Sequence, residues 1–387
     1  MSNQSARTGL VLEPFDVLLF RDGRPLVAGW QVESGLPLPQ TLTGTIRTWL
    51  LKKAGCDFEK FGEAVRRGAT PDEAARDGQP EAVSAVFAIE TRGPWLARRE
   101  NTQPNHWSPL VPMPANVVKM DDKGDDDRSD GETLRRLDPL TSKALPGWWP
   151  QLPSLLPLWR YSAHPAKKAD GFLSWEGLGR FLEGKELKRQ DGIPADDLFA
   201  IDARTGIAID AAGRTVEEGA IYGAGYLSLC SDVAFYAEVV DREGVLDSLA
   251  VRQTRGEIVR FGGDGRRSRL TIVPAVQWPS ATPTDGRGVA MLLTTPCPVD
   301  PNVAADNVWL PAPLRENLVS AAVPGYRAFS GWDLARRGPK PSRFAVEAGA
   351  VFFLKPDSDF SDINHLCSAE DSVFGWGQVL KGVWNHA

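Results

Sequence analysis

The order in which strand-like and helical segments follow one another constrains the fold of this chain more than any other feature of its sequence. Residues 9–20 are rich in β-forming side chains and end at a turn-prone stretch, so they predict a strand that leads into a loop. A helix is predicted next, with Thr41 or Thr43 as its N-cap, because apolar side chains then recur at helical spacing. These side chains are Leu42, Ile46, Trp49 and Leu50.

Regular patterns of this kind return in the second half of the chain. Strand-like sequence occupies residues 198–210 and 220–240, a short helix is predicted around residues 245–252, and a strand follows at residues 270–274. Without the segment between the two regions, the order is β-α-β-β-α-β. This is the order of the split βαβ, ferredoxin-like unit.

The intervening segment, at about residues 90–195, is rich in proline, tryptophan and charge. Residues 121–131 within it contain no apolar side chain that a core could bury. We therefore expect a large insertion in the first unit, with a mobile tip.

A weaker version of the same order follows in the C-terminal part. Strand-like residues 289–295, a helical pattern at 314–322 and strand-like stretches at 326–332 and 344–354 precede a last segment at 374–383. The sequence therefore predicts an α+β chain of two tandem ferredoxin-like modules. The first would span residues 1–275, with the insertion at about 90–195, and the second residues 276–387.

The charge balance argues against a protein that binds nucleic acid indiscriminately. The chain has 44 Lys and Arg against 50 Asp and Glu, a net charge of −6. Residues 121–132 account for most of it, because they hold seven acidic and two basic side chains. The rest of the chain is close to neutral, so local clusters decide which partner can bind.

The spacing of the cysteines and the hydropathy of the sequence indicate in which cellular compartment the protein is located. The four cysteines lie far apart with no CxxC pair, so adjacent spacing supplies neither a zinc site nor a dithiol redox pair. No run approaches the roughly 18 apolar residues that a membrane span needs, and no signal-peptide pattern opens the sequence. We expect a cytoplasmic protein with no membrane partner.

Common catalytic motifs are absent from the sequence, including GxxxxGK[ST], GxSxG, HExxH and a GxGxxG that opens a helix. The histidines lack metal-ligand spacing from one another; they are His106, His164, His365 and His386. We therefore expect no catalytic residue, no metal and no cofactor, and interpret the histidines as structural.

An arginine-rich cluster at residues 252–269 gives a stronger signal. It holds six arginines against Glu257 and Asp264, a local net charge of +4. Glycines beside arginines allow backbone N–H groups to approach phosphate oxygens, which guanidinium groups bind through two parallel hydrogen bonds. The residues in this pattern are Gly262, Gly263, Gly265, Arg266 and Arg267. The alternative is an exposed turn with solvated charges.

A second cluster, at residues 326–343, has the same net charge of +4 and interleaves aromatic side chains with its cations. This combination suits phosphate neutralisation together with stacking on single-stranded bases. Trp332, Arg337, Lys340 and Arg343 are its candidate contacts. Trp332 is equally compatible with a core anchor for a hairpin.

A third, weaker candidate lies near the N-terminus of the first predicted helix, whose free amides form a natural anion site. Arg21 and Arg24 lie in the loop before this helix, and Arg47 lies within it. A charged loop of this kind often only faces water.

Several motifs, read in order, together resemble one known family. They are residues 15–25 (FDVLLFRDGRP), 37–47 (PLPQTLTGTIR), 261–266 (FGGDGR), 293–296 (LTTP) and 330–333 (SGWD) with 339–341 (PKP). The chain resembles the RAMP superfamily, and within it the third-named subunits of Cmr (type III-B) CRISPR effector complexes. The matches span nearly the whole chain outside the insertion.

The resemblance implies two RRM-related, ferredoxin-like modules and a non-catalytic role. Such a subunit grips the 5′ repeat-derived handle of the CRISPR RNA and docks the large polymerase-like subunit and the first repeating backbone subunit. The glycine-rich loops of the family would correspond to residues 261–267 and 375–382. The second contains only Lys381 as a cation, so we expect it to serve packing.

Two alternatives remain open at the level of sequence. Some RAMP proteins are metal-independent endoribonucleases that process repeat RNA, which would require a histidine or tyrosine beside the arginine cluster. A scaffold that joins partners through its tryptophan-rich surface, without RNA contact, is the other.

Overall fold

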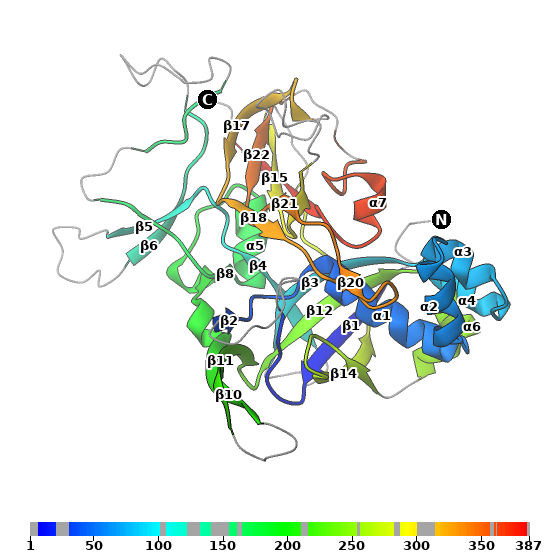
Figure 1. The fold of residues 1–387 in the computed structure, drawn as a ribbon. Helices are drawn as coiled ribbons and strands as arrows, with labels where there is room; N and C mark the ends of the chain where they lie inside the picture. The colour runs from blue at the N-terminus through cyan, green and yellow to red at the C-terminus, as the bar shows by residue number, and fades with distance from the viewer. Residues whose placement is uncertain are drawn as a thin grey trace.

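The computed structural model describes residues 7–20, 31–100, 106–121, 132–140, 155–160, 165–209, 216–253, 256–281, 287–299, 314–356, 360 and 362–384. It is an α+β structure with several sheets, most of whose strand pairs are antiparallel (Figure 1). The predicted mobile tip falls almost entirely outside the described residues.

An eight-stranded antiparallel sheet, the main sheet, forms the centre of the N-terminal part. In spatial order its strands are β13 (Glu257–Arg260), β14 (Arg267–Val273), β1 (Arg7–Pro14), β12 (Val233–Val240), β3 (Glu90–Arg99), β4 (Trp107–Pro112), β8 (Phe172–Leu173) and β9 (Gly192–Ile193). All eight residues of β12 are buried, so both faces of the sheet are covered at its middle.

A group of helices packs on one face of the main sheet: α1 (Pro39–Lys53), α2 (Phe58–Arg66), α3 (Pro71–Arg76), α4 (Glu81–Ala85) and α6 (Val245–Ser248). The predicted apolar stripe of α1 is confirmed, because its four side chains are buried in one cluster with the sheet. Burial of each such side chain stabilises the fold by about 1.5–3 kcal/mol, which determines the helix face that meets the sheet.

The opposite face of the main sheet shares a hydrophobic cluster with helix α5 (Trp175–Leu182) and a C-terminal sheet. The C-terminal sheet has the order β17 (Leu318–Ala322), β22 (Val351–Leu354), β15 (Gly288–Leu293) and β23 (Val379–Trp384). Trp95 and Tyr236 from the main sheet and Phe353 and Trp384 from the C-terminal sheet lie in this cluster. The two sheets are therefore held by a common core.

Smaller sheets and one further helix complete the fold. They are β10 (Phe199–Ile209) with β11 (Val216–Leu229) and β2 (Gln31–Glu33); β16 (Cys297–Pro298) with β21 (Arg343–Val346) and β18 (Tyr326–Phe329); β19 (Trp332–Asp333) with β20 (Gly338–Pro339); β6 (Glu132–Arg136) with β5 (Val117–Asp121) and β7 (Lys167–Lys168); and α7 (Ala369–Ser372). No helix in the described ranges is long and apolar enough to cross a membrane.

The first strand and the first helix differ from their predicted bounds. Strand β1 ends at Pro14, and Leu18 pairs instead with Leu227 through reciprocal backbone hydrogen bonds of 2.8 Å. Helix α1 begins at Pro39 with Leu38 as its N-cap, so the prediction of Thr41 or Thr43 is wrong. Proline at the first helical position needs no N–H partner and has the φ of a helix, which starts the helix earlier.

Two predictions about the position of regular structure are also corrected. Strands β3 and β4 lie inside the predicted insertion but belong to the main sheet, because β3 pairs with β12 and β4 pairs with β3. The charged ends of β3 are paired with carboxylates: Arg98 with Asp232 and Arg99 with Glu13. The helix predicted at residues 314–322 is wrong, because residues 318–322 form strand β17 against β22. A short apolar run does not distinguish helix from strand until its neighbours are known.

Candidate nucleic-acid interface

The glycine-rich loop between β13 and β14 is fixed to the segment that follows β1. The Gly263 N–H donates to the Leu19 carbonyl at 2.8 Å, and Phe261 is buried 4.9 Å from the Phe20 ring. Gly262 has a φ of +93°, and a Cβ there would lie 2.9 Å from the Leu19 carbonyl oxygen. Only glycine fits this position, because a side chain would be both strained and in collision.

Arg266 is held inside the loop by an internal network. Its Nη1 donates to Asp16 Oδ2 at 2.9 Å, and its guanidinium lies 4.6 Å from the centre of the Tyr226 ring. The Tyr226 hydroxyl in turn donates to Asp264 at 3.1 Å. The Val17 N–H, together with the guanidinium groups of Arg204 and Arg266, holds the pKa of Asp16 below its usual value. Asp16 therefore remains a carboxylate that orients Arg266.

Arg267, the next residue, is the first residue of strand β14 and has a different environment from Arg266. Its side chain is exposed, whereas that of Arg266 is half-buried. Gly263, Asp264 and Gly265 are also exposed, and a Cβ on Gly265 would meet no atom within 4 Å. The loop thus presents open backbone beside an exposed guanidinium.

Arg47 lies away from the first turn of α1. It is eight residues from Pro39, about 12 Å along the helix. Its guanidinium lies between the rings of Phe87 and Phe374, at 5.4 and 4.7 Å from their centres, and burial lowers its pKa. Arg21 and Arg24 lie outside the described residues.

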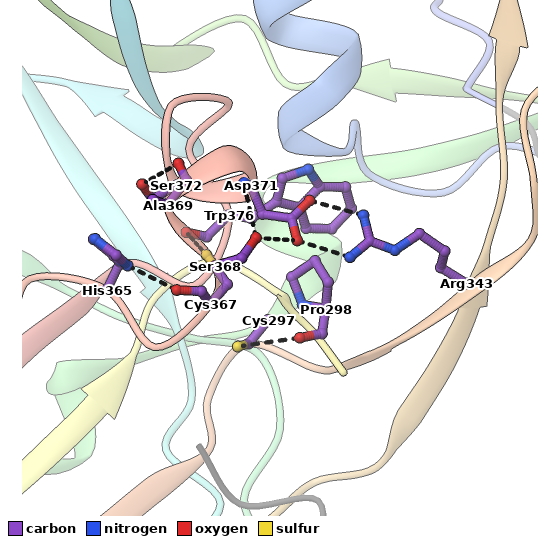
Figure 2. Close-up of polar contacts among 10 residues, drawn as sticks. All are labelled: Cys297, Pro298, Arg343, His365, Cys367, Ser368, Ala369, Asp371, Ser372 and Trp376. Atoms are coloured by element: carbon purple, nitrogen blue, oxygen red, sulfur yellow. Dashed lines mark hydrogen bonds and ion pairs between the residues drawn. The ribbon is translucent and has the colours of Figure 1, made fainter. Parts of the chain in front are cut away.

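In the second cluster, Arg343 binds Asp371 through two hydrogen bonds of 2.7 Å, as Figure 2 shows. Asp371 also accepts from the Ser368 hydroxyl at 3.0 Å. This pair connects strand β21 to helix α7. The guanidinium of Arg343 is therefore engaged within the protein.

The remaining candidates of this cluster lie in and around the β19–β20 hairpin. Trp332 is 55% exposed, and the aromatic anchor of this region is instead Phe329, buried 4.5 Å from the Trp376 ring. Arg337 is exposed at a turn with a φ of +53°. Lys340 is half-buried, and burial lowers its pKa. Trp332 and Arg337 are therefore available to a partner.

The nearby cysteines, Cys297 and Cys367, which Figure 2 also draws, are poor nucleophiles. Burial raises the pKa of Cys297, and it raises that of Cys367 to about 12, so both stay protonated at neutral pH. The Cys367 thiol donates to the Trp376 carbonyl at 3.1 Å, while His365 Nδ1 lies 3.1 Å from the Cys367 carbonyl oxygen. The histidine thus meets the backbone and not the thiol. Among the described residues, no group of three His, Cys, Asp or Glu side chains could hold a metal ion.

The second glycine-rich segment has the packing role that its sequence predicts. Gly375 has a φ of +86°, and a Cβ there would lie 3.0 Å from the carbonyl oxygens of Thr91 and Gly93. A Cβ on Gly382 would lie 2.6 Å from the Leu182 carbonyl oxygen. These glycines allow the C-terminal segment to approach β3 and α5 closely.

Sequence reasoning missed the groups that hold the arginines in place. Asp16 lies within a quoted motif, but Tyr226 and Asp371 carried no signal, because each meets its arginine only through the tertiary fold. Asp333 orients a neighbouring arginine: its Oδ1 accepts the Arg336 N–H at 3.1 Å, and its other oxygen lies 3.8 Å from the Arg336 guanidinium.

Comparison with known proteins adds an independent line of evidence. The family model described as CRISPR-associated protein (Cas_Cmr3) matches residues 10–384. The curated protein "CRISPR system CMR subunit Cmr3" of Saccharolobus solfataricus is 36% identical over 99 residues, which are 24% of this chain and 30% of that protein. The matched segment thus spans less than a third of the curated relative.

Chains of two solved structures align with most of this chain at low sequence identity. A chain of the type III-B Cmr-β complex bound to cognate target RNA and AMPPNP is 17% identical, with 89% of this chain and 86% of that chain covered and a TM-score of 0.48. A chain of the Csm1–Csm4 cassette in complex with pppApA is 13% identical, with 97% and 95% covered and a TM-score of 0.34.

Proposed function

Because this chain belongs to the Cas_Cmr3 family of CRISPR-associated proteins, the Cmr3 subunits of type III-B complexes, we propose that it is a non-catalytic RNA-binding subunit of such an effector. It caps the 5′ handle of the CRISPR RNA, and it docks the large polymerase-like subunit and the first repeating backbone subunit in cytoplasmic antiviral defence.

The observation that carries this proposal is the geometry of the loop at residues 261–267. The loop is anchored by the hydrogen bond from the Gly263 N–H to Leu19 and by the burial of Phe261, while Asp264 and Gly265 are exposed. The exposed amides of these two residues, close to Arg267, suit a phosphate group. Anchoring beforehand lowers the ordering cost when the strand binds.

The candidate contacts divide by role within this proposal. Gly262, Gly263 and Gly265 shape the loop, and Arg267, Trp332, Arg337 and Lys340 meet the strand, together with Arg21 and Arg24. Arg47, Arg266 and Arg343 are already held by aromatic rings or carboxylates, so they shape the surface that the strand meets. Recognition then combines phosphate neutralisation with stacking on splayed handle bases.

The same proposal includes two ferredoxin-like modules, at residues 1–275 and 276–387. Strands of the main sheet come from the first range, and those of the C-terminal sheet from the second. In the described part of residues 276–387, α7 is the one helix, so the second module would be much reduced in helix.

Crosslinking of guide RNA within the purified complex tests the RNA-binding role. We expect crosslinked peptides from residues 256–270 and 326–343, and co-purified small RNAs that share one 5′ end. Complete absence of both peptides would instead favour a scaffold without RNA contact.

Incubation of the purified protein with repeat RNA, with and without EDTA, tests the absence of catalysis. We expect no cleavage in either condition. Specific cleavage that disappears on substitution of a histidine, such as His365→Ala, would favour the endoribonuclease alternative.

A further inference from the structure

The end of the main sheet formed by β13 and β14 has one exposed, basic face. Arg260 lies directly across from Arg267, and Ile258 directly across from Arg269. Side chains that are directly opposite, or two positions apart on one strand, share a face of the sheet. We call this surface, with Phe15 beside it, the outer arginine face: Phe15, Ile258, Arg260, Arg267 and Arg269.

No carboxylate in the described part of the chain neutralises the arginines of this face. Within the described ranges, no ion pair joins Arg260, Arg267 or Arg269 to a carboxylate. The two nearest acidic positions in the pairing have other partners, because Glu13 binds Arg99 and Glu257 binds Lys53. Three exposed guanidinium groups thus remain available to an external anion.

Exposed apolar side chains lie among these cations. Ile258 is 64% exposed and Phe15 is 52% exposed. The guanidinium of Arg269 lies 5.7 Å from the centre of the Phe15 ring, and its aliphatic stem passes over Gly256, where a Cβ would lie 3.5 Å from Arg269 Cγ. Arg269 is therefore held in position before any partner binds.

The spacing of the three arginines suits a chain of phosphates. Directly opposite residues have Cβ atoms about 5 Å apart, and residues two apart on a strand are separated by about 7 Å. Each guanidinium group presents a fork that binds a phosphate through two hydrogen bonds. Arg267 is both the last residue of the glycine-rich loop and the first of β14, so a strand that leaves the loop reaches this face directly.

We propose that the outer arginine face binds the sugar–phosphate backbone of a single RNA strand, independently of base sequence, beyond the segment that the loop grips. The inference rests on the proposed function, which brings the strand to the loop. It adds Arg260, Arg269 and Phe15 to the RNA interface. At this face the spacing of the positive charges selects the ligand, whereas the shape of the bases does not.

The test measures binding of fluorescein-labelled single-stranded RNA of mixed sequence to the full chain, by anisotropy over a range of salt concentrations. Each phosphate neutralised on a single strand contributes about 0.7 to the slope of log K against log salt. The triple variant Arg260→Gln, Arg267→Gln, Arg269→Gln should therefore lose about 2 from the slope, for every sequence tested. Phe15→Ala should weaken binding by about 5-fold or more through lost stacking.

A matched control makes the same change in net charge elsewhere. The variant Arg67→Gln, Arg76→Gln, Arg242→Gln removes three exposed arginines that are each paired with a carboxylate. Its slope should stay close to that of the wild type. The single variant Arg260→Gln, with an expected slope loss of about 0.7, checks the result should the triple variant fold poorly.

An unchanged slope in the triple variant would overturn the proposal, as would a wild-type chain that binds no single strand. A triple variant that still binds RNA but no longer assembles into the complex would also overturn the proposal, because this face would then bind an acidic protein surface. Failure of the proposed function is distinguishable, because it removes handle crosslinks at residues 326–343, which lie outside this face, and leaves the salt slope of the isolated chain unaffected.

Discussion

Neighbouring arginines in this chain differ in whether they are bound within the protein or exposed, and contacts between residues far apart in the sequence determine which. Arg266 donates to Asp16, which lies 250 residues away in sequence, whereas Arg267 is exposed. Arg343 is likewise used by Asp371, while Arg337 is exposed at its turn. At the residue scale, a cluster of positive charge identifies a surface but does not separate the arginines that build it from those that meet a partner.

The conformation of the glycine-rich loop leads to a prediction at the same scale. Gly262→Ala should destabilise the protein by about 2–4 kcal/mol, because it adds strain at a positive φ and displaces the loop from the Leu19 carbonyl. Gly265 also has a positive φ, but a Cβ there would meet no atom, so Gly265→Ala should lower the free energy of unfolding by only about 1–2 kcal/mol. Urea unfolding of both variants measures the difference, and equal losses would contradict the close packing of Gly262.

The buried Asp191 leads to a prediction about pH. Its side chain is 1% exposed, and burial by itself would raise its pKa. Hydrogen bonds from the Arg180 guanidinium at 2.8 Å and the Lys188 N–H at 2.7 Å outweigh burial and hold the pKa below its usual value. The ionised form is therefore favoured in the folded state. Its stabilisation is fully present above the unfolded pKa of about 4 and is lost as the pH falls through the lower folded pKa.

Asp191→Asn should accordingly lower the free energy of unfolding at pH 7 by about 3 kcal/mol, because it leaves the Arg180 charge without its partner. Below about pH 4 the difference from the wild type should shrink. Thermal unfolding between pH 7 and pH 3 measures both effects. A stability difference that does not change with pH would show that the carboxylate charge of Asp191 is not responsible.

At the scale of elements, the errors of the sequence analysis have one cause. Strand β3 falls within the predicted insertion because charged residues flank its short apolar run of Trp95, Leu96 and Ala97. Strand β17 was assigned to a helix because five residues are too few for a period. In both cases the neighbouring strand, β12 or β22, supplies the hydrogen bonds that decide the conformation.

Arg136 joins three elements and gives a prediction at this scale. From β6 its guanidinium donates to the Phe181 carbonyl of α5 at 2.6 Å, to the Val383 carbonyl of β23 at 2.7 Å and to Asp138 at 2.8 Å, with only 5% of the side chain exposed. Arg136→Met would leave these acceptors unpaired and should cost about 3 kcal/mol.

The matched control for Arg136 is Arg67→Met, which breaks an exposed i,i+4 ion pair with Glu63. It should cost less than about 1 kcal/mol. Chemical denaturation of both variants provides the measurement. A loss for Arg136→Met as small as that of the control would mean that its bonds do not hold the three elements together.

At the scale of the whole molecule, the main sheet and the C-terminal sheet share one buried cluster, in addition to the cluster that each has on its other face. Residues 276–387 expressed alone would expose Phe353, Trp384 and their neighbours to water, so we expect this fragment to be unfolded. The full chain should unfold in one transition that is identical by tryptophan fluorescence and far-UV circular dichroism. A fragment with dispersed amide NMR signals, or two separate transitions in the full chain, would contradict a common core.

Local periodicity, local charge and ordered motifs were enough to predict the α+β class, the apolar face of α1, the positions of both basic clusters and the family. The folded chain was needed to see that Arg266 and Arg343 are engaged within the protein, that Trp332 is exposed, and that β3 belongs to the main sheet. The cause is separation along the chain. The partners of Arg266 and Arg343 lie 250 and 28 residues away, beyond the reach of any local pattern, yet they fix which charges remain for a partner.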